Sequence, residues 1–103
     1  VTQYRMPIDS NPVIARNIRI TGRVQGVGYR AWAADEARTL MLDGWVRNRA
    51  DGSVEMVVRG ASAAVENMIR RCHAGPRSSH VYQVLTEATA GVVATGFAIM
   101  PTV

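Results

Sequence analysis

Three glycines stand close together in residues 22–28, Gly-Arg-Val-Gln-Gly-Val-Gly, and Arg30 follows shortly after them. Glycine permits the tight turns of a loop with exposed amides, but it weakens a regular helix or strand. If a helix begins directly after this loop, its N-terminus adds unsatisfied donors and a positive dipole end. The loop amides can then converge on one phosphate group, and the Arg30 guanidinium can hold two oxygens of the same anion. The candidate phosphate-binding amides are those of Gln25, Gly26, Val27, Gly28, Tyr29 and Arg30.

This loop differs from two familiar phosphate-binding motifs. No Gly-Lys-Ser/Thr follows it, as in a Walker loop, and no acidic residue is placed to hold magnesium. The downstream acidic residue and the repeated parallel units of the dinucleotide-binding fingerprint are also missing. A glycine-rich loop alone is a weak signal, and the alternative is that Arg30 is a solvated helix residue.

Length and composition indicate one ordinary globular domain. The chain has 103 residues, of which 48% are hydrophobic and 19% charged, which excludes collagen-like, coiled-coil and wholly disordered classes. A single cysteine, Cys72, excludes a disulfide framework and a thiolate zinc cage, so a reducing, cytoplasmic location is the default expectation. His73 and His80 have no carboxylate or thiol at ligand spacing, and we therefore expect no metal and no cofactor.

The charge balance favours an anionic partner. Twelve basic residues, all arginine, oppose 8 acidic ones, which gives a net charge of +4. The arginines are scattered from Arg5 to Arg77 and form no stripe that would neutralise several phosphates together, so we expect no nucleic-acid partner. No apolar stretch is long enough to span a membrane, and the first residues lack the apolar region of a signal peptide. We therefore expect a soluble protein without membrane contact.

Hydrophobic periodicity predicts the elements that position the loop. Alternation around Ile18 and Ile20 is typical of a half-buried strand, and Asp51-Gly52 between two such runs indicates an antiparallel hairpin. Apolar residues recur at helical spacing in two segments. Asp43-Gly44 is expected to stop the first helix, and the second is expected to have Ser62 as its N-cap and to end at Gly75-Pro76. The predicted elements are strands from residue 16, over 45–48, 53–59, 81–86 and 97–99, and helices over 29–40 and 61–72.

The order of these elements predicts an α+β fold. Two helices with one apolar stripe each cannot cover both faces of such a sheet, so both should pack on one face of an antiparallel sheet. The expected architecture is a ferredoxin-like split βαβ sandwich, in the order βαββαβ with a short extra C-terminal strand. Residues 1–15, with Pro7 and Pro12, are expected to form an extended, partly mobile leader to a single domain over residues 16–103.

Two sequence motifs resemble those of the acylphosphatase family. They are Gly22-Arg-Val-Gln-Gly-Val-Gly-Tyr-Arg30, and Gly44-Trp-Val-Arg-Asn48 followed by Asp51-Gly-Ser-Val-Glu55. Their order and separation match the family over roughly residues 16–99. The resemblance implies metal-independent hydrolysis of the carboxyl–phosphate bond of acylphosphates to a carboxylate and inorganic phosphate. It also implies that Arg30 is the phosphate-binding catalytic arginine and that Asn48 positions the attacking water.

Elementary chemistry is consistent with these implied roles. An asparagine amide does not titrate near neutrality, so Asn48 can hold a water molecule but cannot remove its proton as a general base. The leaving group is a weakly basic carboxylate that can depart without a general acid. Apart from the motif, however, Asn48 precedes a hairpin turn, where asparagine is frequent for conformational reasons alone.

The sequence departs from the family pattern at two places, and it leaves alternative functions open. Residues 40–43 lack the glycine often seen near the end of the family's first helix, and residues 72–80 are more polar than expected. The expected enzyme is a monomer that hydrolyses small-molecule acylphosphates with little selectivity for the acyl group. We expect its product, inorganic phosphate, to inhibit it. The alternative is a non-catalytic anion or nucleic-acid binding module of the same fold. A third hypothesis is a domain that serves a larger assembly. We do not expect it, because 103 residues leave no room for the other domains.

Overall fold

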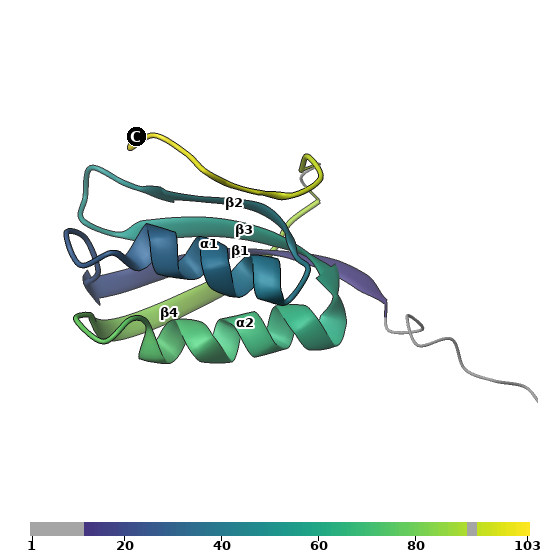
Figure 1. Ribbon diagram of the computed structural model, residues 1–103, viewed down its shortest axis with the longest axis horizontal. Coiled ribbons are helices and arrows are strands. Elements are labelled where there is room, and N and C mark those ends of the chain that lie inside the picture. Colours follow the sequence, from purple (N-terminus) through teal and green to yellow (C-terminus); the bar gives the residue numbers. More distant parts are fainter. Residues whose placement is uncertain (1–11, 91–92) are drawn as a thin grey trace, which may run out of the picture.

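The computed structural model describes residues 12–90 and 93–103 (Figure 1). Its two helices lie on the same face of a single five-stranded sheet, whose strand order is β4-β1-β3-β2-β5. This arrangement confirms the predicted α+β, ferredoxin-like class. The elements are β1 (Val13–Arg23), α1 (Tyr29–Thr39), β2 (Asp43–Asn48), β3 (Val54–Ala61), α2 (Ser62–Ala74), β4 (His80–Ala88) and β5 (Phe97–Ile99).

The sheet is mixed, whereas the sequence predicted an antiparallel one. β1 pairs antiparallel with β3 and β4, and β2 pairs antiparallel with β3, but β5 pairs parallel with β2. The reason is topological, since the chain leaves β4 at one end of the sheet and begins β5 at that same end, where β2 also begins. Two side chains hold β5 there: Arg38 donates to the Phe97 carbonyl at 2.9 Å, and Asp43 accepts from the Gly96 amide at 2.8 Å.

The first strand begins earlier than predicted. Residue 13 already pairs with Ala61 of β3, so residues 13–15 of the expected leader belong to the sheet, while residues 1–11 lie outside the described residues. The same pairing corrects the predicted N-cap of α2. Ala61 occupies the cap position without a side-chain hydrogen bond, and Ser62 is the first helical residue, because β3 runs directly into the helix. The Ser62 amide donates instead to the Pro12 carbonyl at 3.0 Å.

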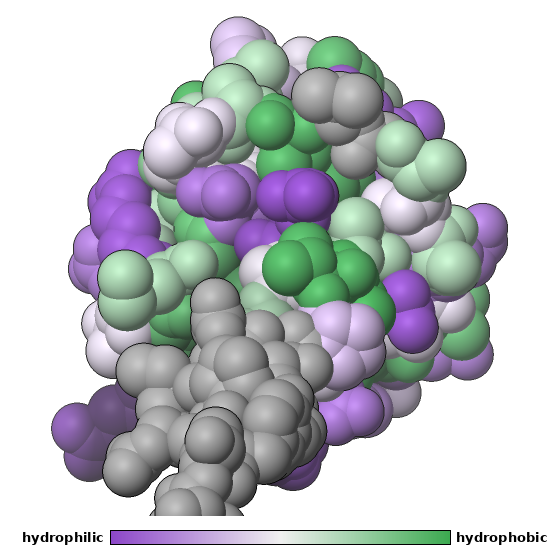
Figure 2. All heavy atoms as spheres, turned by 90° about the vertical axis from the view of Figure 1, so that its right-hand side faces the viewer, coloured by the Kyte–Doolittle hydropathy of each residue, from purple (hydrophilic) through white to green (hydrophobic). Residues whose placement is uncertain are grey.

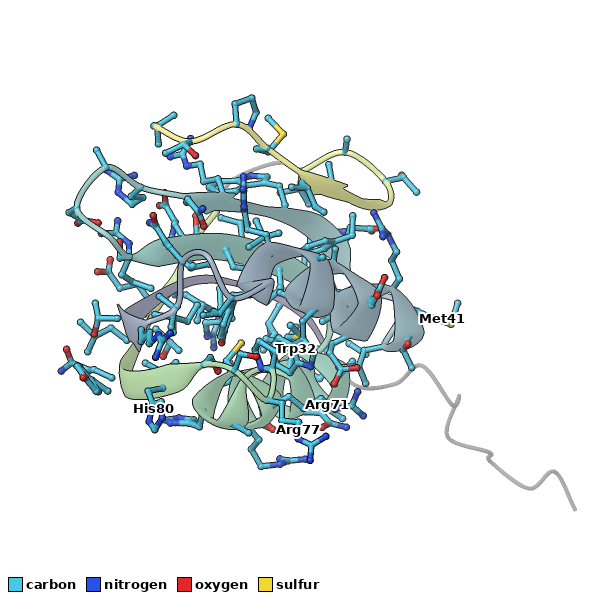
Figure 3. All side chains as sticks on the ribbon, turned by 60° about the vertical axis from the view of Figure 1, so that its left-hand side comes forward. Trp32, Met41, Arg71, Arg77 and His80 are labelled. Atoms are coloured by element: carbon cyan, nitrogen blue, oxygen red, sulfur yellow. The ribbon has the colours of Figure 1, made fainter. Side chains whose placement is uncertain are left out.

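Helix α1 also ends differently from the prediction. Asp43 and Gly44, expected to stop the helix, are already part of β2. The helix ends at Thr39, and Met41 adopts a left-handed backbone with φ 58°. The Met41 amide donates to Arg38 and the next amide donates to Ala37, which is the hydrogen-bond pattern of a Schellman motif. Methionine therefore occupies the position that glycine usually takes, and its side chain projects into solvent (Figure 3).

The core lies between the helices and the inner face of the sheet. As predicted, Ile18 and Ile20 of β1 point into it, together with residues from every neighbouring element. At the end of the molecule where α1 finishes, hydrophobic and hydrophilic side chains are interspersed on the surface (Figure 2). The fully buried residues include Ala33, Ala34, Ala37, Val46, Val54, Met56, Val58, Val65, Met68 and Cys72.

Candidate active site

The loop before α1, the end of β2 and the C-terminal segment meet at the opposite end of the molecule, on the left in Figure 1. Together they line a pocket of about 280 Å³. Its wall consists of residues 24–26 and 28–31, with Asn48 from β2 and Ile99 from β5. The two predicted catalytic residues, Arg30 and Asn48, therefore line one cavity although 18 positions separate them in sequence.

The predicted phosphate-binding residues are nearly all in this wall. Gln25, Gly26, Gly28, Tyr29 and Arg30 line the pocket. Val27 does not, because its half-buried side chain packs against the hydrophobic core.

The loop conformation leaves backbone donors available. Gly26 and Gly28 have φ values of 73° and 80°, in the left-handed region that glycine adopts at little cost, and Gly28 is the N-cap of α1. The first helical hydrogen bond is donated by the Trp32 amide to the Gly28 carbonyl at 3.0 Å. Among the described residues, the amides of residues 25–31 donate to no other group of the protein. These are the orphan donors of a helix N-terminus and the loop that leads into it.

Arg30 brings a positive charge to the rim of the pocket. Its Nη1 lies 3.5 Å from the Met100 carbonyl oxygen. None of the ion pairs within residues 12–90 and 93–103 includes Arg30. The guanidinium is therefore not neutralised by a carboxylate of the described chain and keeps donors for an anion.

Asn48 is held through its main chain and leaves its side chain free. It is the last residue of β2, it pairs with Val54 of β3, and its carbonyl accepts a 3.1 Å hydrogen bond from the Val103 amide. In the described part of the chain, no hydrogen bond uses its half-buried side-chain amide. That amide is thus positioned by the sheet and available to a small polar ligand such as water.

A second link joins the loop to the hairpin after Asn48. The Gln25 side-chain nitrogen donates at 2.8 Å to the Arg49 carbonyl and at 2.8 Å to the Ser53 carbonyl. The hairpin closes on itself as well, since the Arg49 amide donates to Ser53 at 2.9 Å and the Gly52 amide to Arg49 at 3.0 Å. This tight turn confirms the hairpin predicted from Asp51-Gly52.

The opposite side of the hairpin is braced by a nearly buried carboxylate. Glu55 accepts hydrogen bonds from Asn17 at 2.9 Å, from the Arg47 Nε at 2.9 Å and from Arg49 at 2.8 Å. Burial raises the pKa of this carboxyl, but the hydrogen bonds and the positive charge of Arg47 outweigh burial and lower it to about 2. Glu55 is therefore ionised at neutral pH and anchors the strand pair that presents Asn48.

Comparisons with known proteins agree with this geometry. The family model for acylphosphatase matches residues 16–99. The chain belongs to the acylphosphatase family. An acylphosphatase from Rhizorhabdus wittichii is 56% identical over 90 residues, which cover 87% of this chain and 91% of the relative. Acylphosphatases are hydrolases that act on acid anhydrides, and the chain is an enzyme of this class.

Solved acylphosphatases share the fold. The structure of an acylphosphatase from Coxiella burnetii superposes with a TM-score of 0.82 at 27% identity, covering 85% of this chain and 93% of that one. The acylphosphatase from Bacillus subtilis superposes with a TM-score of 0.80 at 32% identity, covering 84% and 98%. The family assignment therefore rests on sequence and on backbone geometry alike.

Other reactive side chains of the described residues lie away from the pocket. Cys72 is buried in α2, as predicted, and burial raises the pKa of its thiol to about 12, which disfavours the nucleophilic thiolate. His73 and His80 are exposed, and His80 lies at the start of β4 (Figure 3). In the part of the chain that the structure describes, no three His, Cys, Asp or Glu residues are grouped as metal ligands. No helix there is long and apolar enough to cross a membrane.

Sequence reasoning missed one wall of the pocket. Ile99 lines it because β5 pairs parallel with β2 in a register that places Ile99 opposite Val46. The hydrophobic residues near the end of the sequence predicted a strand, but they did not indicate that this strand pairs with β2. The two hydrogen bonds of the Gln25 side chain were also missed, since they join residues more than 20 positions apart.

Proposed function

We propose that this protein hydrolyses the carboxyl–phosphate bond of small acylphosphates to a carboxylate and inorganic phosphate, without a metal ion. One observation carries the proposal: the glycine-rich loop residues 25, 26 and 28–30, the side chain of Arg30 and the free side chain of Asn48 line the same pocket, and the loop amides donate to no other group of the described chain. Such a site combines an anion cradle with a hydrogen-bonding group for water.

In this mechanism the loop binds the phosphoryl group. Phosphoryl transfer spreads negative charge over three equatorial oxygens, and fixed donors aimed at those oxygens stabilise the transition state. The amides of residues 25–30 and the dipole of α1 supply such donors on one side. Arg30 adds a planar pair of N–H groups and a full positive charge, which supports catalysis without a bound cation.

Asn48 positions the attacking water. Its side-chain amide both donates and accepts, so it can orient a water molecule in line with the bond that breaks. The water attacks phosphorus, the phosphorus–oxygen bond to the acyl group breaks, and the bonding electrons leave with the carboxylate. The water proton passes to a phosphate oxygen of the substrate, because asparagine is not a base and the carboxylate leaves without protonation.

The proposal extends to location, oligomeric state and inhibition. We expect a cytoplasmic monomer that binds no nucleic acid and is inhibited competitively by inorganic phosphate, since product and substrate share the cradle. The proposed donors address the phosphoryl group, which all acylphosphates have in common, so we expect little discrimination between acyl groups.

The test is hydrolysis of benzoyl phosphate by the purified chain in the presence of a chelator. Arg30→Ala should lose both phosphate affinity and turnover, whereas Asn48→Ala should lose turnover and keep nearly the parent's affinity for inorganic phosphate. Arg70→Ala, an exposed arginine on α2, is the matched control and should behave as the parent. Equal loss of phosphate affinity in the Arg30 and Asn48 variants would contradict the assigned roles. An inactive parent that still binds phosphate would make the protein a non-catalytic anion-binding module.

A further inference from the structure

The Gln25 side chain spans the two halves of the pocket. Gln25 belongs to the phosphate loop, whereas both of its acceptors, the carbonyls of Arg49 and Ser53, belong to the hairpin between β2 and β3. Both distances are 2.8 Å, and two carbonyl acceptors require that the NH₂ end of the amide faces the hairpin. One side chain therefore uses both of its donors to join segments that local sequence does not connect.

The two acceptors flank the residue proposed to hold water. Arg49 directly follows Asn48, and Ser53 directly precedes Val54, which pairs with Asn48 across the hairpin. A bond to each of these carbonyls fixes the position of the Asn48–Val54 pair relative to the loop. Any shift of the loop along or away from the hairpin lengthens at least one of the two bonds.

The hairpin does not need Gln25 for its own closure. The Ser53 carbonyl also accepts from the Arg49 amide, and the Arg49 carbonyl also accepts from the Gly52 amide. Loss of the Gln25 side chain therefore leaves neither carbonyl without a partner, and the hairpin remains braced by Glu55 on its other side. What the side chain adds is the relative placement of loop and hairpin rather than the fold of either.

We propose that Gln25 is a positioning residue, whose side chain holds the phosphate cradle and the water-binding Asn48 at the separation that in-line attack requires. This inference rests on the proposed function, because it assigns Gln25 to the same reaction. Positioning acts on the rate of attack more than on phosphate binding, since the cradle's own donors stay in the loop and in Arg30. A displacement of about 1 Å between reacting groups is enough to reduce a rate about a hundredfold.

The test compares Gln25→Ala and Gln25→Met with the parent on benzoyl phosphate. Methionine keeps the length of the side chain and removes its donors without adding charge. Both variants should lower kcat about ten- to hundredfold and change the inhibition constant of inorganic phosphate by less than about threefold. Gln83→Ala, an exposed glutamine on β4, is the matched control and should keep the parent's kcat. A cooperative thermal transition in each variant verifies folding.

A double substitution separates positioning from a merely structural role. If Gln25 acts through Asn48, adding Gln25→Ala to Asn48→Ala should lower kcat by no more than about twofold beyond the single Asn48→Ala change. Fully multiplicative losses, or equal loss of phosphate affinity and kcat in Gln25→Met, would overturn the inference. So would variants with the parent's kcat. A parent without turnover would overturn the proposed function and this inference together, whereas an active parent with unaffected Gln25 variants would overturn the inference alone.

Discussion

The Tyr29 hydroxyl donates a 2.8 Å hydrogen bond to the main-chain carbonyl of Cys72 and so ties the first residue of α1 to the last turn of α2. Both residues are fully buried. The Cys72 carbonyl has no helical partner, because the residue four positions later is Pro76, which lacks an N–H. Tyr29 therefore satisfies a buried acceptor while its backbone begins the helix that faces the pocket.

Replacing Tyr29 by phenylalanine should destabilise the protein by about 1–3 kcal/mol, because the Cys72 carbonyl is left buried and unpaired. Urea unfolding monitored by tryptophan fluorescence measures this loss. Tyr82→Phe is the control, since Tyr82 is 81% exposed, and it should change the free energy of unfolding by less than about 0.5 kcal/mol. Equal stability of the two variants would show that the Tyr29 hydroxyl contributes nothing.

Glu55 should make stability depend on acidity. Its pKa is lowered to about 2 in the folded protein, so its contribution is fully present above the ordinary pKa of a free glutamate and is lost as pH falls toward 2. Glu55→Gln should cost roughly 3 kcal/mol at most at pH 7, and the difference from the parent should vanish near pH 2. Glu66→Gln on α2 is the control. A constant difference between parent and Glu55→Gln across this pH range would refute the assignment.

Met41 offers a stabilising substitution. Its left-handed backbone at the end of α1 costs an ordinary residue about 1 kcal/mol, which glycine avoids. Met41→Gly should therefore raise the free energy of unfolding by about 1 kcal/mol, and Met41→Ala, which keeps the cost, should not. Thermal unfolding distinguishes the two. Met41 is 87% exposed, so little packing is lost in either variant.

Ile99 should influence which acyl groups are hydrolysed well. It is 46% exposed at the pocket, whereas the other large apolar residues of the wall, Val24 and Tyr29, are buried at 1%. An apolar acyl group that extends from the cradle therefore meets Ile99. Ile99→Ala should lower kcat/KM for benzoyl phosphate up to about tenfold and leave acetyl phosphate nearly unchanged.

The control for this substitution is Val103→Ala, which removes a similar side chain from the same segment outside the pocket wall. Parallel assays on benzoyl and acetyl phosphate give the ratio of kcat/KM for the two substrates in each variant. An equal loss on both substrates would indicate a general effect on the site instead of contact with the acyl group.

The sequence by itself determined the main features of the fold and of the glycine-rich loop before α1. The alternation around Ile18, the helical spacing after Tyr29 and the turn at Asp51-Gly52 are local properties of the chain, so the sheet-and-helix order could be predicted from them. The glycines and Arg30 are likewise contiguous, and five of the six predicted phosphate-binding residues line the pocket. Only Val27 departs from that pattern, because its side chain packs toward the core.

The tertiary structure alone decided how separate segments meet. The parallel pairing of β5 with β2 places Ile99 in the pocket, and the Gln25 side chain joins the loop to the hairpin. The end of α1 was also mispredicted, because Met41 closes a Schellman motif without glycine. The first two features depend on which residues distant in sequence become neighbours, and the third on a left-handed backbone that methionine adopts against its usual preference. Local patterns carry no information about either.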